Sequence, residues 1–455
     1  MVRNLTAGNP AKQILLFSLP ILIGNIFQQF YSMVDTIIVG QFLGNSSLAA
    51  VGATGAVSFF IMGFVNGTTT GLTVITAKRF GAGNHAGVKR SILNCFQVAI
   101  VMALVMSTLS VLCIRPLMHL LETPKDIFEE AVAYISVICG GMGATIFYNL
   151  MAATMRALGD SRTPLIFLVV SSALNIALDL LLVAVLHTGV AGAAWATVVS
   201  QVIAGTLSLL YGLKHNEYLH VGNIFRKPDF KEWFAHLRVG VPMGLQFSVT
   251  AIGSMVLQRA FNLFGTPGVA AYTAASKVDN LLTQPMMAIG TTMATYAGQN
   301  RGAGDYKRLM KGVRIAFFYS LAAAGLAMLI KFVSGDAFIL MFLDEKTDLI
   351  MEYANTYMLW TMVFYPFLGF VFLFRNTLQG VGETLFPMLG GVGELFARSI
   401  TSMVLPGMVG YLGVCLASPI AWITAGCMAG LRYLYIASRW KKDPALMQGP
   451  LQPEN

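Results

Sequence analysis

The sequence predicts an all-α integral membrane protein of twelve transmembrane helices, arranged as two six-helix bundles that are related by a parallel internal repeat. Three observations predict this class: a surplus of apolar residues, apolar stretches of spanning length along the whole chain, and a pattern repeated at a nearly constant offset. The 455 residues are 56% hydrophobic and 11% charged, with a mean hydropathy of +0.68. A water-soluble globule of this size would lack the polar side chains to cover its surface, so a bilayer must take up the surplus.

Each predicted span is a mostly apolar stretch of about eighteen residues or more. As a helix rising about 1.5 Å per residue, it crosses a hydrocarbon core about 30 Å thick. The twelve spans cover residues 13–38, 50–75, 91–113, 128–154, 164–186, 191–213, 238–262, 272–297, 312–333, 351–377, 386–407 and 411–437. The first is too long for a signal-peptide core and no small-residue cleavage site follows it, so we expect it to remain as a helix.

The basic residues alternate between the two sides of the predicted membrane. The net charge is +9. With both termini taken as cytoplasmic, 23 of the 30 lysines and arginines fall on the inner side and four on the outer side. This asymmetry follows the positive-inside rule, so it explains the basic composition without a nucleic-acid partner.

Motifs of catalysis and nucleotide binding are absent from the sequence. The five cysteines are scattered through the spans, and the six histidines lie in loops or at helix ends without metal spacing. No G-x-x-x-x-G-K-[ST] loop, HExxH or GxSxG occurs. We therefore expect no enzyme, no catalytic residue, no cofactor and no direct use of ATP.

The two halves of the chain repeat one pattern. Gly81 in "RFGAGNHAGVKR" and Gly302 in "NRGAGDYKRLMKG" are 221 residues apart, and Pro20 and Pro242 are 222 apart. "ALGDSRTPL" and "GVGETLFPM" recur at an offset of 223. Six membrane-spanning helices per copy return the chain to the side of the membrane on which it entered. Both copies therefore begin on the same side, and the repeat is parallel.

This repeat predicts the domain organisation. An N-terminal six-helix lobe covers 1–213 and a C-terminal lobe covers 238–440, with a polar cytoplasmic linker at 214–237 and a cytoplasmic tail at 441–455. Two bundles that face each other across a cleft can expose one site to either side of a membrane in turn, as secondary transporters do. An integral-membrane scaffold made by gene duplication is the alternative interpretation.

Several motifs together resemble one known family. "SLPILIGNIFQQFYSMVDTIIVGQFLG", the loop "AKRFGAGN" with its counterpart "GQNRGAGD", and "ALGDSRTPL" resemble multidrug and toxic compound extrusion (MATE) transporters of the bacterial kind, over about residues 10–440. The resemblance implies a multi-pass protein of the bacterial inner (plasma) membrane. It implies exchange of Na⁺ or H⁺ for drugs or other cationic or amphipathic organic compounds, and we expect a monomer.

Two carboxylates lie in the predicted spans of the first lobe. Asp35 follows Lys12 by 23 residues, which places it roughly 34 Å along its helix from the inner face. Asp179 lies about 22 Å along its own helix. A charge inside the bilayer is costly and indicates a functional site by default. The alternative is that either side chain caps a helix end or pairs with an arginine.

Two neutral side chains can join these carboxylates. Asn175 lies one helical turn before Asp179, and Thr197 lies about 12 Å below the outer surface, so four oxygen-bearing side chains can converge at a similar depth. Asp35, Asn175, Asp179 and Thr197 also match, in residue type, the cation site of the family that the chain resembles. Their oxygens suit Na⁺, and the two carboxylates can instead carry a proton. The sequence alone does not choose between these ions.

Five further side chains are candidates to line a substrate cavity: Asn25, Gln28, Tyr134, Lys277 and Asp279. For Tyr134 the alternative is ordinary anchoring at the membrane interface. Lys277 and Asp279 are two residues apart, so they point to different faces of a helix.

A second acid–base pair lies in the predicted span 386–407. Glu394 and Arg398 are spaced i, i+4, so we expect them to pair within the helix, mainly for structure.

A lipid-linked oligosaccharide flippase of the same superfamily is an alternative function. It would need a large basic cavity for a diphosphate, and only Arg259, Lys277 and Arg398 are available within the bilayer, apart from the basic residues assigned to its inner and outer sides.

Overall fold

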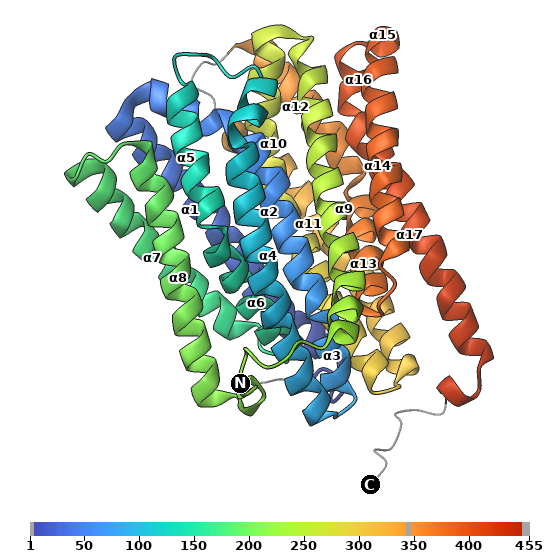
Figure 1. The fold of residues 1–455 in the computed structure, drawn as a ribbon. Helices are drawn as coiled ribbons and strands as arrows, with labels where there is room; N and C mark the ends of the chain where they lie inside the picture. The colour runs from blue at the N-terminus through green and yellow to red at the C-terminus, as the bar shows by residue number, and fades with distance from the viewer. Residues whose placement is uncertain (1–3, 343–346, 448–455) are drawn as a thin grey trace. The chain divides into compact units, whose positions relative to one another are not determined.

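The computed structural model describes residues 4–342 and 347–447, and within them all regular secondary structure is helical (Figure 1). The predicted all-α class is confirmed. Helices suit this composition because a helix satisfies its backbone hydrogen-bonding groups within its own segment, as the interior of a bilayer requires.

The helices of the N-terminal half are α1 (Pro10–Ala53), α2 (Gly55–Leu72), α3 (Val74–Gly81), α4 (His85–Leu120), α5 (Phe128–Gly140), α6 (Met142–Ala157), α7 (Arg162–Asp179), the π-helical η1 (Leu180–Val185), α8 (Val190–His215) and the short η2 (Glu217–Leu219). Those of the C-terminal half are α9 (Phe230–Asn262), α10 (Gly265–Gly302), α11 (Tyr306–Leu340), α12 (Asp348–Val363), α13 (Tyr365–Gly380), α14 (Leu385–Val404), α15 (Pro406–Val409), α16 (Tyr411–Cys415), α17 (Ala417–Lys442) and η3 (Ala445–Met447).

The described part of the chain contains eight helical segments that are long and apolar enough to cross a membrane. Two bent pairs, α5 with α6 and α12 with α13, bend by 46° and 50° and would each make one more span. The two remaining predicted spans, 272–297 and 386–407, lie on α10 and α14, whose charged side chains lower their hydropathy. All twelve predicted spans therefore fall on helices, and the chain is a multi-pass membrane protein.

Some predicted spans differ from the helices in length or continuity. α1 runs beyond residue 38 to Ala53 and contains a non-helical residue at Gly44, where φ is +84°. The predicted span 128–154 is divided at Gly141. A Cβ there would lie 2.3 Å from the side chain of Val198, so only glycine lets this junction approach α8 so closely. Hydropathy does not report such breaks, because the residues around them remain apolar.

Contacts group the described residues into two compact units. Unit 1 contains Ile23–Phe80 and Asn84–Gly244, and unit 2 contains Asn4–Leu22, Gly81–Gly83 and the chain from Leu245 onward. The first helix of each half, α1 or α9, thus begins in one unit and continues in the other. These two changes of unit, at residues 23 and 245, are separated by the offset of the repeat. Because the units rest on contacts and the predicted lobes on the repeat, the lobe boundaries stay a prediction.

Each unit has its own packing. In unit 1, α2, α4, α5 and α6 enclose a core that includes Ile92, Met142 and Leu150, all fully buried. α8 packs against α5, α6 and α7, so α7 and α8 lie side by side (Figure 1). In unit 2, α10 packs against α11, α12 and α13, and α14 packs against α17.

A close backbone approach in unit 1 joins α2 to the first turns of α9. A Cβ at Gly71 would lie 2.6 Å from the Cα of Gly240. No real Cβ tolerates that distance, so the two helices depend on glycine to meet here.

Candidate functional site

Two carboxyl groups meet inside unit 1. Asp35 lies on α1, and Asp179 is the last residue of α7, directly before the π-helical turn of η1. The two side chains lie close enough to interact, and Asp179 is fully buried. π-Helical turns inside α-helices occur frequently at functional sites.

The two neutral residues predicted for this site lie beside the carboxyl pair. Asn175, on α7, is buried, and its Nδ2 donates to Thr197 Oγ1 on α8 at 3.3 Å. Thr197 Oγ1 also donates to the carbonyl oxygen of Ala193 at 3.3 Å. The packing of α7 against α8 brings these residues together. Asn175 and Thr197 therefore meet, whereas their role as cation ligands beside the two carboxyl groups stays a prediction.

Tyr31 is a member of this cluster that the sequence reasoning missed. Its hydroxyl lies 3.4 Å from Thr197 Oγ1. It precedes Asp35 by four residues on α1, so the two share one helix face. That spacing was the available signal, but tyrosine at this spacing is common in membrane helices as an interfacial anchor.

The surroundings of the cluster are apolar. Ile38, Val39, Val183 and Ala193 form a small buried core, and Tyr134 packs against it. Tyr134 also lies close enough to Asp35 and Asp179 to interact with their charges. In such a medium a charge is poorly solvated, so a bound cation or a proton has a large effect on the energy of the pair.

One oxygen of the pair is available to a ligand. Asp35 Oδ1 is buried and finds no hydrogen-bond partner among the residues that the structure describes. A buried acceptor without a partner costs free energy, which a bound Na⁺ or a proton would recover. Carboxylate, amide and hydroxyl oxygens suit a hard cation, so the donor set fits Na⁺. Within the described ranges, no group of three or more His, Cys, Asp or Glu side chains is arranged to hold a metal ion.

The substrate-cavity candidates of the first lobe lie in different environments. Gln28 is exposed on α1, and Asn25 is half-buried. Tyr134, by contrast, borders the carboxyl cluster. Their contact with a substrate remains a prediction for all three.

The charged candidates on α10 face different partners within unit 2. The hydroxyl of Tyr365 donates to Asp279 Oδ1, whereas Lys277 Nζ lies over the ring of Phe342, 5.4 Å from its centre. This agrees with the expectation that the two side chains leave the helix on different faces. Whether either one touches a substrate stays a prediction.

The predicted pair on α14 forms. Arg398 Nη2 lies 2.8 Å from Glu394 Oε1, and Arg375 Nη1 from α13 lies 4.0 Å from Glu394 Oε2. Both members of the α14 pair are buried. The charge of Arg398 is therefore offset inside unit 2.

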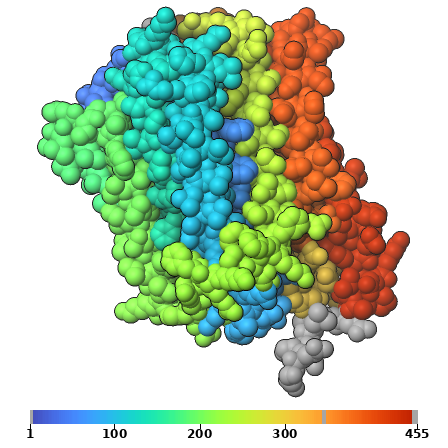
Figure 2. Space-filling view, viewed as in Figure 1, coloured from blue at the N-terminus to red at the C-terminus, as the bar shows by residue number. Residues whose placement is uncertain are grey.

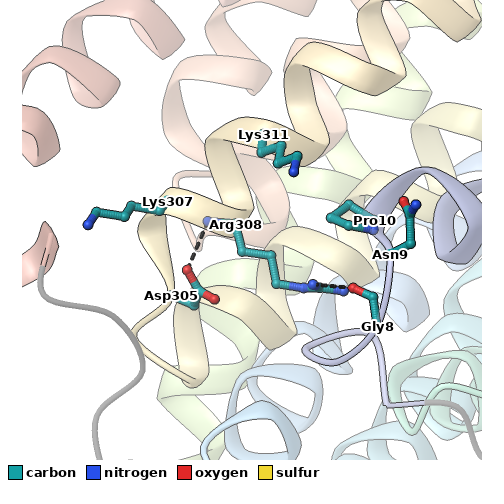
Figure 3. Close-up of a pocket in the computed structure, with 7 residues that line it drawn as sticks. All are labelled: Gly8, Asn9, Pro10, Asp305, Lys307, Arg308 and Lys311. Carbon is teal, nitrogen blue, oxygen red and sulfur yellow. Dashed lines mark hydrogen bonds between the residues drawn. The ribbon is translucent and has the colours of Figure 1, made fainter.

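A separate open pocket in unit 2 lies where the N-terminal segment meets the start of α11 (Figure 3). Arg308 holds that segment: its Nε, Nη2 and Nη1 donate to the carbonyl oxygens of Leu5, Ala7 and Gly8 at 3.1, 2.7 and 2.6 Å. Asp305 begins α11 by accepting a hydrogen bond from the backbone N–H of Arg308 at 2.8 Å. None of the residues predicted for cation or substrate binding lines this pocket.

Comparison with known proteins covers nearly the whole chain. The model of the MatE family matches twice, over residues 20–181 and 242–404. The two matches begin 222 residues apart, which confirms the internal repeat.

Individual relatives agree with this match. The chain is 29% identical over 440 residues to the probable multidrug resistance protein YpnP of Bacillus subtilis, covering 96% of this chain and 97% of that protein. It is 26% identical over 446 residues to the probable multidrug resistance protein NorM of Chromobacterium violaceum, covering 94% of each. The solved structure of a multidrug resistance MATE family transporter in an outward-facing conformation superposes with a TM-score of 0.86 at 24% identity, over 97% of this chain and 99% of the other.

Proposed function

The chain belongs to the MatE family of multidrug efflux transporters, and on this premise we propose that it is a secondary active exporter that exchanges Na⁺ or H⁺ for cationic or amphipathic organic compounds. Members of this family are transporters and not enzymes. The proposal includes a bacterial inner membrane, cytoplasmic termini, a monomeric protein and an ion gradient in place of ATP.

The observation that carries this proposal is the carboxyl pair of unit 1, in which Asp179 is fully buried and Asp35 is half-buried. Asp35 and Asp179 lie close enough to interact, and Asn175 and Thr197 add an amide and a hydroxyl of the same cluster. A gradient-driven exporter needs an ion-binding site of this kind. The ion must bind there reversibly, and its charge must change the energy of the protein.

Coupling follows from the difference between the two states of the carrier. An ion that enters from outside neutralises the carboxyl pair, and it shifts the balance of outward and inward states only by as much as it binds one state better. The drug is then released outward as the ion is taken up, and the ion leaves on the inner side. Both Na⁺ and H⁺ satisfy this scheme.

The flippase alternative has less support from the charged residues. A diphosphate needs several uncompensated basic groups, and Arg398 is already paired with Glu394. Lys277 faces the ring of Phe342. We therefore retain the exporter as the proposed function.

The direct test is efflux from everted membrane vesicles that contain the protein. A panel of cationic dyes is loaded, and Na⁺ and pH gradients are imposed separately. The proposal expects extrusion with at least one gradient and none with ATP alone. Transport that needs ATP, or none of any dye with either gradient, would contradict it.

A further inference from the structure

The segment between the two halves carries an aromatic and basic surface that the exporter mechanism does not use. This segment, residues 220–234, has three phenylalanines whose side chains are largely exposed: Phe225 at 88%, Phe230 at 70% and Phe234 at 69%. Arg226, Lys227 and Lys231 lie between them and are exposed as well. Exposing phenylalanine side chains to water costs free energy, and contact with an apolar partner would recover it. We therefore expect this surface to have an apolar partner.

The linker is fixed to unit 1 at a defined level of α4. Gln97 Nε2 donates to the carbonyl oxygens of Ile224 and Arg226 at 2.8 and 2.9 Å. Gln97 Oε1 accepts a hydrogen bond from Trp233 Nε1 at 3.1 Å. The residue between the two held carbonyls is Phe225, the most exposed large hydrophobic residue in the described part of the chain. Figure 2 shows this yellow-green segment lying across the lower part of α4.

The level of Gln97 lies inside the predicted membrane span. That span begins at residue 91, so Gln97 is six residues further along α4, or about 9 Å at the helical rise. Phe225 is therefore held within the depth at which interfacial segments insert, roughly 5–10 Å into the boundary of headgroups and acyl chains.

The charges of the segment are separated by sign. Asp229 pairs with Arg90, and Glu232 accepts two hydrogen bonds from Arg79 Nη2 at 2.8 and 2.9 Å. The acidic groups are thus used within unit 1. Arg226, Lys227 and Lys231 remain on the outer surface of the segment, beside the phenylalanines.

We propose that residues 223–234 form an interfacial anchor: the phenylalanines insert among the lipid acyl chains, and the three basic side chains bind the phosphates of anionic lipids. Aromatic rings beside basic residues match a leaflet with apolar chains below negative headgroups. The predicted orientation places this segment at the cytoplasmic leaflet, which carries anionic lipid.

The test uses the full-length protein in nanodiscs of equal phosphatidylcholine and phosphatidylglycerol. A photoreactive benzoylphenylalanine replaces Phe225, and lipid adducts are measured by mass spectrometry after illumination. The control carries the same group at Glu217, whose side chain is 73% exposed outside the anchor. We expect about tenfold more lipid adduct at position 225 than at position 217. Equal adduct yields at the two positions would overturn the proposal and would favour a soluble protein as the partner of this surface.

A second arm tests the charge component. With the native basic residues present, we expect the lipid adducts at position 225 to be enriched in phosphatidylglycerol over phosphatidylcholine by about threefold or more. In the R226Q/K227Q/K231Q background this enrichment should be lost. An unchanged lipid ratio would overturn the role of the basic residues. Neither arm depends on transport, so failure here is distinct from failure of the proposed export function.

Discussion

The substitution Asp35→Asn tests the carboxyl pair most directly. Asparagine keeps the shape of aspartic acid, and its amide can donate a hydrogen bond toward Asp179, so we expect the fold to survive. The pair then loses one of its two ionisable groups and the free acceptor Asp35 Oδ1 becomes part of a neutral amide.

The expected magnitude follows from the contacts in the site. A hydrogen bond or close contact to a charged group is worth about 1.5–3 kcal/mol. Loss of one such interaction with the coupling ion corresponds to roughly 10–150-fold weaker binding. The assay is dye efflux from everted vesicles, recorded as the concentration of Na⁺ or H⁺ that gives half of the maximal rate. That concentration should rise by this factor, or coupling should be lost.

A double-mutant cycle with Asp179→Asn separates a shared site from two independent groups. If the two carboxyl groups bind one ion, the loss of ion-binding free energy in D35N/D179N will be smaller than the sum of the two single-variant losses, by about 1 kcal/mol or more. Glu129→Gln is the matched control, because Glu129 pairs with Arg115 at the surface and removal of such a pair costs about 1 kcal/mol at most. Additive costs, or wild-type ion dependence in D35N, would refute the reasoning.

Three further predictions concern the packing of each unit. Gly71→Ala places a methyl group against the backbone of α9, so the free energy of unfolding should fall by about 1–3 kcal/mol and the thermal midpoint in detergent should fall with it; an unchanged midpoint would contradict the close approach. Arg308→Gln removes the donors that hold the N-terminal segment, so hydrogen exchange at residues 5–8 should accelerate, whereas Lys307→Gln should leave it unchanged. Glu394→Gln leaves Arg398 buried without its partner, at a cost of about 3–5 kcal/mol in the free energy of unfolding; stability equal to the wild type would show that the pair is dispensable.

The helices and the repeat could be predicted from the sequence because both depend on local pattern. A span needs only enough consecutive apolar residues, and the rise of a helix is constant, so a residue's depth can be counted along the chain. For the same reason Asp35, Asn175, Asp179 and Thr197 could be expected at a similar depth. The pairing of Glu394 with Arg398 also followed from helical spacing alone.

Tertiary contacts decided the rest. Tyr31 joins the cluster because the fold brings its hydroxyl to 3.4 Å from Thr197 Oγ1 on α8. Gln97 holds the linker because residues more than a hundred positions away fold back onto α4. The break at Gly141 and the change of unit within α1 and α9 leave no mark in hydropathy. Apolar pattern determines that a segment is helical and how deep each residue lies, but the side chains that meet at that depth are chosen by packing between segments distant in the chain.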